Sequence, residues 1–135
     1  MRAVLQRILK ADITIDGTER KSVGQGLLVL LGVMEGDGQT QAEFLAKKIP
    51  ELRIFEDGEG RMNLSLEEIG GEMMVVSNFT LGADCKKGRR PSYTKSARPE
   101  DAEKLYDYFL DCIRRRDFPA GDRQVRRRYA DRAHQ

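Results

Sequence analysis

Hydrophobic residues recur along this chain with two spacings, one typical of strands and one typical of helices. Near the N-terminus, apolar side chains alternate with polar ones in residues 2–9 and 12–15, and Asp16-Gly17 follows as a turn signal, which predicts that a β-hairpin opens there. Gln25 to Met34 is continuously apolar between glycines, which predicts a short, buried, central strand. Further strands are expected at three segments, residues 52–56, 62–66 and 72–77, with EDGEGR as the turn between the first two.

Two other segments carry apolar residues at helical spacing. One follows Thr40, which is expected to be its N-cap, and Pro50 is expected to close it. Pro99 opens the other, from about Glu100 to Arg116, which is expected to cover a sheet face with a single apolar stripe. That stripe consists of Ala102, Leu105, Tyr106, Phe109, Leu110 and Ile113. Several strands with two helices indicate an α+β or mixed α/β fold.

Length and charge limit the classes of protein that fit. A chain of 135 residues with 39% hydrophobic residues forms one domain that buries roughly two thirds of its unfolded surface. The formal net charge of +2 does not by itself demand nucleic acid as a partner. Eight of the 24 basic residues lie at or after Arg114, so the tail is strongly basic. The longest apolar run, Leu27 to Val33, is too short to cross a bilayer, so no membrane partner is expected.

Cysteine and histidine usage removes several kinds of chemistry. Cys85 and Cys112 lie far apart in a chain without a signal-like apolar segment, which predicts reduced thiols in the cytoplasm. His134 is the single histidine and lies next to the last residue, which excludes Ser-His triads and most histidine metal sites. The cysteines lack ligand spacing as well. Neither a metal nor a cofactor is expected.

The segment from Met74 to Thr94 carries the clearest chemistry. A buried strand runs into short polar side chains, which can hold an oxyanion together with backbone N–H groups, and then into a basic loop that can hold a polyanion. Taken alone, the hydroxyls are more often ordinary strand-edge groups, and the basic loop is more often a solvated charge run or a stiff turn set by Gly88 and Pro91. The polar residues are Ser77, Asn78 and Thr80, and the cations are Lys86, Lys87, Arg89 and Arg90.

Six motifs in one frame closely resemble the D-aminoacyl-tRNA deacylase family. They are MRAVLQR at 1–7, GLLVLLGV at 26–33, LRIFED at 52–57, MNLSL at 62–66, VVSNFTL at 75–81 and KKGRRPSY at 86–93. Several long motifs are far more specific than one short pattern. The resemblance implies a strongly curved, barrel-like sheet with two covering helices. It also implies a homodimeric cytoplasmic enzyme that hydrolyses the ester joining a D-amino acid, or glycine mischarged on tRNA-Ala, to tRNA.

The chemistry of such a reaction agrees with a site that lacks histidine. An aminoacyl ester is already activated, so its hydrolysis needs mainly a positioned water and donors for the developing oxyanion. The resemblance implies that Ser77, Asn78, Phe79 and Thr80 line the pocket, that backbone N–H groups at Phe79 contact the substrate, and that the 2′-hydroxyl of the RNA assists. Thr80 is disfavoured as a covalent nucleophile because no base is available to take its proton.

The resemblance also assigns residues that bind tRNA. The basic loop is expected to contact the acceptor end, and Arg7 is expected near the pocket, where it helps to fix a Gly-Pro insert. A lone arginine in a strand is otherwise an ordinary exposed residue. The family more often has glutamine where Asn78 stands, which shortens the reach of the amide. The loop residues are Lys86, Lys87, Arg89, Arg90 and Pro91.

The C-terminal part departs from the family pattern. Family members continue with a segment resembling GRFGADMQ, a strand, and a Gly-Pro motif that excludes L-amino acids, whereas this sequence contains no Gly-Pro. One choice of codons for residues 123–135, read one nucleotide later, encodes GRFGADMQIELT. We therefore expect a deacylase-like domain at 1–118 and, at 119–135, an atypical basic tail that is disordered or out of frame. Sequencing the gene across codons 115–135 tests the frameshift.

Two alternatives to a chirally selective deacylase stay open. A chain without the Gly-Pro filter is either a non-catalytic remnant of the family that binds tRNA or another RNA, or a deacylase that has lost chiral selectivity. In either case the basic tail, if it is translated out of frame, binds RNA only non-specifically.

Overall fold

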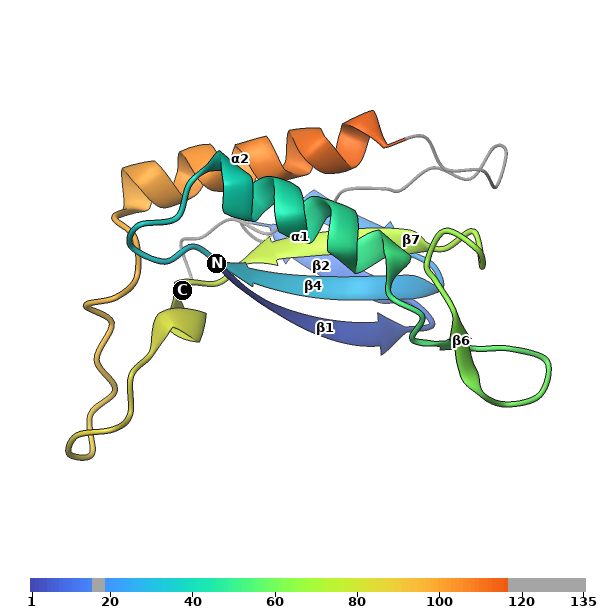
Figure 1. Ribbon diagram of the computed structural model, residues 1–135, viewed down its shortest axis with the longest axis horizontal. Helices are drawn as coiled ribbons and strands as arrows, with labels where there is room; N and C mark the ends of the chain where they lie inside the picture. The colour runs from blue at the N-terminus through green and yellow to red at the C-terminus, as the bar shows by residue number, and fades with distance from the viewer. Residues whose placement is uncertain (16–18, 117–135) are drawn as a thin grey trace.

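Two helices lie side by side on one face of a three-stranded sheet in the computed structural model, which describes residues 1–15 and 19–116 (Figure 1). The strand order is β1-β4-β7. The strand β1 (Arg2–Ile8) runs antiparallel to β4 (Gly26–Gly32), and β7 (Glu72–Ser77) runs parallel to it. The continuous apolar run of the sequence is thus confirmed as the central strand. It has a neighbouring strand on each edge and is covered by the helices (Figure 1).

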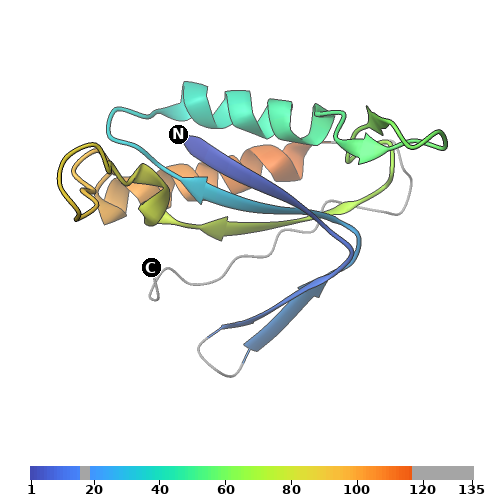
Figure 2. The ribbon, with the colours of Figure 1, turned by 90° about the horizontal axis from the view of Figure 1, so that it is seen from below.

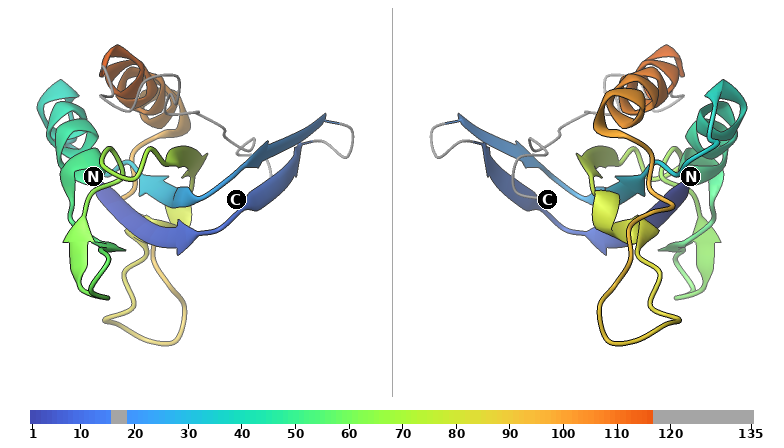
Figure 3. Two further views of the ribbon diagram at one scale, coloured as in Figure 1. Left: turned by 90° about the vertical axis from the view of Figure 1, so that its right-hand side faces the viewer. Right: turned by 90° about the vertical axis from the view of Figure 1, so that its left-hand side faces the viewer.

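A second, two-stranded sheet projects from the first. The strand β2 (Ala11–Ile15) pairs antiparallel with β3 (Glu19–Val23), which confirms the predicted hairpin at Asp16-Gly17, although residues 16–18 lie outside the described ranges. Figure 2 shows this hairpin extending away from the helix-covered sheet. In Figure 3 the strands curve continuously from the three-stranded sheet into the hairpin, as a strongly curved sheet requires.

A third antiparallel pair is shorter than its sequence pattern suggested. The strand β5 (Phe55–Glu56) and the strand β6 (Met62–Leu64) pair with an irregular register. The intervening turn is held by Asp57, whose carboxylate accepts the N–H groups of Arg61 and Glu59. These hydrogen bonds to the charged form lower the pKa of Asp57. Because the turn takes up five residues of the segment, only two or three residues on each side remain for the ladder.

The helix α1 (Gln39–Glu51) differs from its prediction at both ends. Its N-cap is Gly38, whose N–H is bonded by Gln41 Oε1 at 2.7 Å, so the expectation that Thr40 caps the helix is wrong. Because the side chain of Gln41 accepts the Gly38 N–H, it stabilises a helix that begins before Thr40. Pro50 is buried inside the last turn rather than closing the helix, which ends one residue later.

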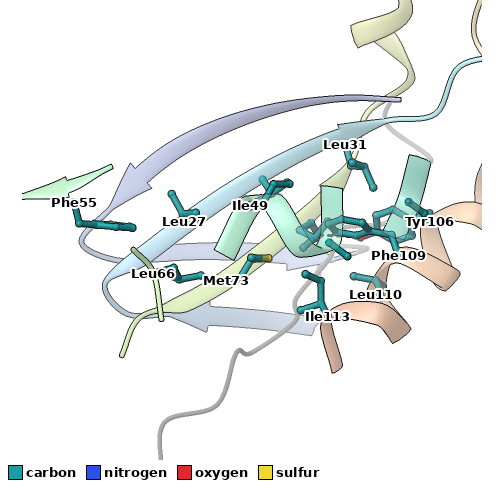
Figure 4. Close-up of a cluster of buried hydrophobic side chains, with 14 residues drawn as sticks. Leu27, Leu31, Ile49, Phe55, Leu66, Met73, Tyr106, Phe109, Leu110 and Ile113 are labelled. Atoms are coloured by element: carbon teal, nitrogen blue, oxygen red, sulfur yellow. Dashed lines mark hydrogen bonds between the residues drawn. The ribbon is translucent and has the colours of Figure 1, made fainter. Parts of the chain in front are cut away.

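The helix α2 (Pro99–Arg115) matches its prediction, including proline in its first turn. Figure 4 shows its apolar stripe packed against side chains from the sheet and from α1. Ala102 and Leu105 of the predicted stripe are half-buried, while the other four members are buried. The hydroxyl of Tyr106 donates to the Val75 carbonyl at 2.9 Å, which fixes the helix to β7. The four buried members are Tyr106, Phe109, Leu110 and Ile113.

Cys85 is exposed, Cys112 is half-buried, and both are free thiols. Within residues 1–15 and 19–116, no group of three His, Cys, Asp or Glu residues is placed to hold a metal ion. In the same ranges no helix has the length and apolar character needed to cross a membrane. The predicted tail at 119–135 lies outside the described residues.

Candidate active site at the end of β7

The parallel pairing of β4 and β7 determines which backbone groups are available at the end of β7. The Asn78 N–H donates to the Leu31 carbonyl at 2.9 Å, so Asn78 faces β4. In a parallel strand the next residue directs its N–H and C=O to the opposite edge. The backbone N–H and C=O groups of Ser77 and Val75 therefore point away from β4. The Tyr106 hydroxyl donates to the Val75 carbonyl. The backbone of Ser77 is left at a strand edge that no other described strand covers.

Asn78 turns the chain from β7 into the short 3₁₀ helix η1 (Phe79–Gly82). Its Oδ1 accepts the Thr80 N–H at 3.0 Å and also the Thr80 hydroxyl. The Phe79 N–H makes no hydrogen bond to any residue that the structure describes. Phe79 and Thr80 are both exposed. One backbone donor and one hydroxyl are thus presented to solvent directly after the buried strand.

Two glycines allow the surrounding segments to approach η1 closely. A Cβ on Gly32 of β4 would lie 2.9 Å from Leu81 Cβ, and a Cβ on Gly82 would lie 2.1 Å from Ser96 Oγ. Any larger residue would push η1 away from the sheet or from the segment that precedes α2. The position of the Phe79 N–H therefore depends on these glycines.

Two residues that sequence reasoning did not name hold η1 from either side. Ser96 Oγ donates to the Phe79 carbonyl at 3.1 Å, and Arg2 Nη1 donates to the Leu81 carbonyl at 2.9 Å. Arg2 belongs to the motif MRAVLQR and Ser96 to none of the six motifs, but neither position carries a signal that its side chain would bond to η1. Together they bond two carbonyls of η1 and leave the Phe79 N–H without a described partner.

The basic loop is a hairpin whose base is well defined. Asp84 and Ser92 exchange backbone hydrogen bonds of 2.7 and 2.9 Å, and Gly88, with φ at 67°, lies in the loop between them. The Lys86 N–H lowers the pKa of Asp84, and the ammonium of Lys95, 3.7 Å away, adds to this effect. The predicted tRNA-contacting side chains are all exposed on this hairpin, namely Lys86, Lys87, Arg89, Arg90 and Pro91.

An aromatic contact joins the hairpin to the strand end. The rings of Phe79 and Tyr93 lie 5.2 Å apart between centroids and are tilted by 58°. Phe79 is 40% exposed and Tyr93 is 39% exposed, so each ring keeps a solvent-facing surface. The structure thereby brings the predicted pocket residues and the base of the predicted tRNA-binding loop together.

Arg7 is the predicted site residue that the structure does not place there. Arg7 of β1 pairs with Leu27 of β4. Ser77 of β7 pairs with Leu31 of β4, which pairs in turn with Ala3 of β1. Four residues along a strand correspond to roughly 13 Å. Arg7 Nη1 instead donates to the Ile54 carbonyl at 3.1 Å. Its role beside a Gly-Pro insert stays a prediction.

A cavity of about 570 Å³ opens between the beginnings of α1 and α2. Glu35, Thr94 and Lys104 contribute to its lining, but none of residues 77–80 does. Ser96 lines it and also bonds to the Phe79 carbonyl, so the cavity adjoins the strand end rather than enclosing it. Around the end of β7 the structure thus brings together a backbone donor, hydroxyls and cations.

The sequence profile of the D-Tyr-tRNA(Tyr) deacylase family matches residues 4–127. This chain belongs to that family. The D-aminoacyl-tRNA deacylase of Desulfatibacillum aliphaticivorans is 56% identical over 113 residues, which cover 84% of this chain and 77% of the relative. That of Thermodesulfovibrio yellowstonii is 49% identical over 119 residues, which cover 88% and 82%. The resemblance inferred from the six motifs is confirmed.

Two solved structures share the fold of this chain. The c-Myc DNA unwinding element binding protein matches with a TM-score of 0.84 and 33% identity, over 97% of this chain and 85% of that one. A probable eukaryotic D-amino acid tRNA deacylase matches with a TM-score of 0.75 over 97% and 88%, and its 16% identity shows the fold alone. The predicted α+β fold of the deacylase type, with a curved sheet and two covering helices, is confirmed.

Proposed function

We propose that this deacylase-family protein hydrolyses the ester of D-aminoacyl-tRNA and releases the free D-amino acid and tRNA. The observation that carries the proposal is the end of β7, where the unbonded Phe79 N–H lies beside a hairpin of exposed cations. Membership of the deacylase family supports the class of reaction. Glycine mischarged on tRNA-Ala is proposed as a second acyl group, because glycine has no side chain and therefore no D or L form.

Ester hydrolysis at this site rests on positioned donors. As water attacks the carbonyl carbon, negative charge develops on the carbonyl oxygen, and the Phe79 N–H can donate to it without moving because η1 is held by Asn78, Ser96 and Arg2. Removing one such donor typically costs about 10²- to 10³-fold in kcat. An activated ester needs no strong side-chain base, which agrees with the groups that line the strand end.

The basic hairpin between Asp84 and Ser92 is proposed to bind the nucleic acid. Its exposed lysines and arginines can neutralise phosphates of the acceptor end, and the ring pair of Phe79 and Tyr93 offers a surface on which an unpaired base can stack. A base stacked on the Phe79 ring would contact the same residue whose N–H is proposed to bind the ester. Binding of the tRNA terminus and positioning of its ester are thus coupled through Phe79.

We further propose that the protein acts as a cytoplasmic homodimer. Exposed apolar residues on the sheet support a second subunit: Val4 of β1 is 48% exposed, and its register partner Leu30 of β4 is half-buried. Val4→Asp should lower the sedimentation coefficient to that of a monomer. Leu9→Asp, at a residue that is 83% exposed, should leave it unchanged. A monomeric wild type would contradict this proposal.

The activity is tested by incubating the purified chain with D-Tyr-tRNA, L-Tyr-tRNA and Gly-tRNA and following ester loss. Release from the D-amino acid and glycine alone supports the proposal. Release from all three indicates a deacylase without chiral selectivity. Tight binding without release indicates a tRNA-binding remnant and contradicts hydrolysis.

A further inference from the structure

The orientation of the Asn78 amide follows from its contacts. The Thr80 backbone N–H, which can only donate, lies 3.0 Å from one terminal atom of the amide, so that atom is the oxygen. The Thr80 hydroxyl contacts the same oxygen. An amide oxygen can only accept, and a hydroxyl carries a single proton, so the proton of Thr80 is committed to Asn78.

We propose that Asn78 is a positioning residue that holds Thr80 as a hydrogen-bond acceptor, and that Thr80 accepts a hydrogen bond from a donor of the aminoacyl-adenosine end. This inference rests on the proposed function. Thr80 is exposed, so the lone pairs of its oxygen are accessible to a substrate. Two donors lie close to the scissile ester of such a substrate, the ribose 2′-hydroxyl and the α-ammonium group.

The same geometry limits what Thr80 can do. As a nucleophile it would have to lose its proton to an amide oxygen, which is not a base. As an oxyanion donor it would have to break its bond to Asn78, whereas the Phe79 N–H is already free of any described partner. Accepting a hydrogen bond is the role that needs no rearrangement.

The identity of residue 78 has a geometric reason in this account. The oxygen of an asparagine reaches the N–H two residues ahead and closes a compact turn. A glutamine is one methylene longer and does not close the same ring. Asn78 thus caps η1 and also orients the Thr80 hydroxyl.

The first test measures binding, so it does not depend on turnover. The probe is an adenosine with a D-tyrosyl group in amide linkage at its 3′ position, and its affinity is measured by calorimetry. Thr80→Val keeps the shape of the side chain and removes the oxygen, and it should weaken binding about tenfold. Thr80→Ser keeps the oxygen and should bind within about twofold of the wild type. Equal affinity of the Val variant and the wild type would overturn the inference.

The second test addresses the coupling of the two residues. Asn78→Ala should weaken binding when Thr80 is present and have little further effect in the Thr80→Val background. Asn78→Asp retains an acceptor oxygen and should restore most of the affinity, a rescue that a merely structural loss would not show. Thermal unfolding of each variant identifies those that do not fold. An equal loss from Asn78→Ala in both backgrounds would overturn the positioning role.

The third test identifies the donor with two modified probes. One lacks the 2′-hydroxyl and the other carries an acetylated α-amine. The modified probe that lacks the group donating to Thr80 should bind the Thr80→Val variant and the wild type with equal affinity. If Thr80→Val weakens both modified probes by the same factor as the parent, neither donor is read and the inference fails. Hydrolysis of D-Tyr-tRNA by the wild type would still uphold the proposed function in that case, and failure of the wild type to bind the parent probe would contradict both.

Discussion

Single residues set the chemistry of this protein through hydrogen bonds that the sequence does not display. The motif VVSNFTL identified the residues at the end of β7, but not that Asn78 would accept the hydrogen bond of the Thr80 hydroxyl. That contact depends on how tightly the chain turns after the strand. Arg2 and Ser96 were missed for a related reason, since each acts on a carbonyl of η1 that only the fold brings near.

Tyr108 provides a prediction about pH at this scale. Its hydroxyl donates to Glu43 of α1 at 2.5 Å, and this bond to a carboxylate raises the pKa of Tyr108 from 10.0 to about 12. The unfolded chain therefore loses this proton first, so the stabilising contribution is fully present below pH 10 and is lost as the pH rises to about 12.

The expected result for Tyr108→Phe is a free energy of unfolding that falls less steeply between pH 10 and 12 than that of the wild type, measured by urea denaturation. The absorbance titration of tyrosinate should lose a component near pH 12 in the same variant. Loss of a component near pH 10 in place of the one near pH 12 would show that Tyr108 ionises at its ordinary pH.

At the scale of elements, η1 is the part that positions the site. Gly82→Ala would place a Cβ 2.1 Å from Ser96 Oγ and displace the serine that holds the Phe79 carbonyl. We expect kcat/KM for D-Tyr-tRNA to fall at least about tenfold, since small displacements of catalytic groups are costly. Gly58→Ala is the matched control, because a Cβ there meets no atom within 4 Å. Equal activity of the two variants would contradict the role assigned to η1.

The basic hairpin is the second element with a testable role. Replacing Arg89 and Arg90 by glutamine should weaken tRNA binding and reduce the slope of log affinity against log salt by roughly 1.4, for two lost phosphate contacts to a single strand. The control replaces Lys47 and Lys48 of α1, which are also exposed and carry the same charge. The control should keep the wild-type slope. A slope that changes equally in both variants would indicate a non-specific effect of net charge.

The sequence predicted long elements better than short ones. β7 was predicted with its exact bounds, and β4 and α2 within two residues at each end, because hydrophobic patterning is strong in each. η1 has four residues, too few for any periodic signal. The start of α1 was misplaced because Gly38 is a weak cap by itself and is made effective by the side chain of Gln41.

At the scale of the whole molecule, the alternation of strands with two helices sufficed to predict an α+β domain. The strand order and register did not follow from the pattern, because they depend on which faces pack together. That register decides where Arg7 lies: the sequence motif placed it at the pocket, and the fold places it near Ile54 at the other end of the sheet. The expectation for residues 119–135 stays a prediction.

The central claim is that positioned backbone donors, without a titrating acid or base from a side chain, accelerate cleavage of the aminoacyl ester. The measurement that tests it most directly is the pH dependence of single-turnover kcat/KM for D-Tyr-tRNA between pH 5 and 8, corrected for spontaneous hydrolysis. The account predicts a profile whose single inflection is that of the substrate's own α-ammonium group, because no histidine and no group of three His, Cys, Asp or Glu residues lies among the described residues around Phe79. A bell-shaped profile with two inflections in this range would contradict it.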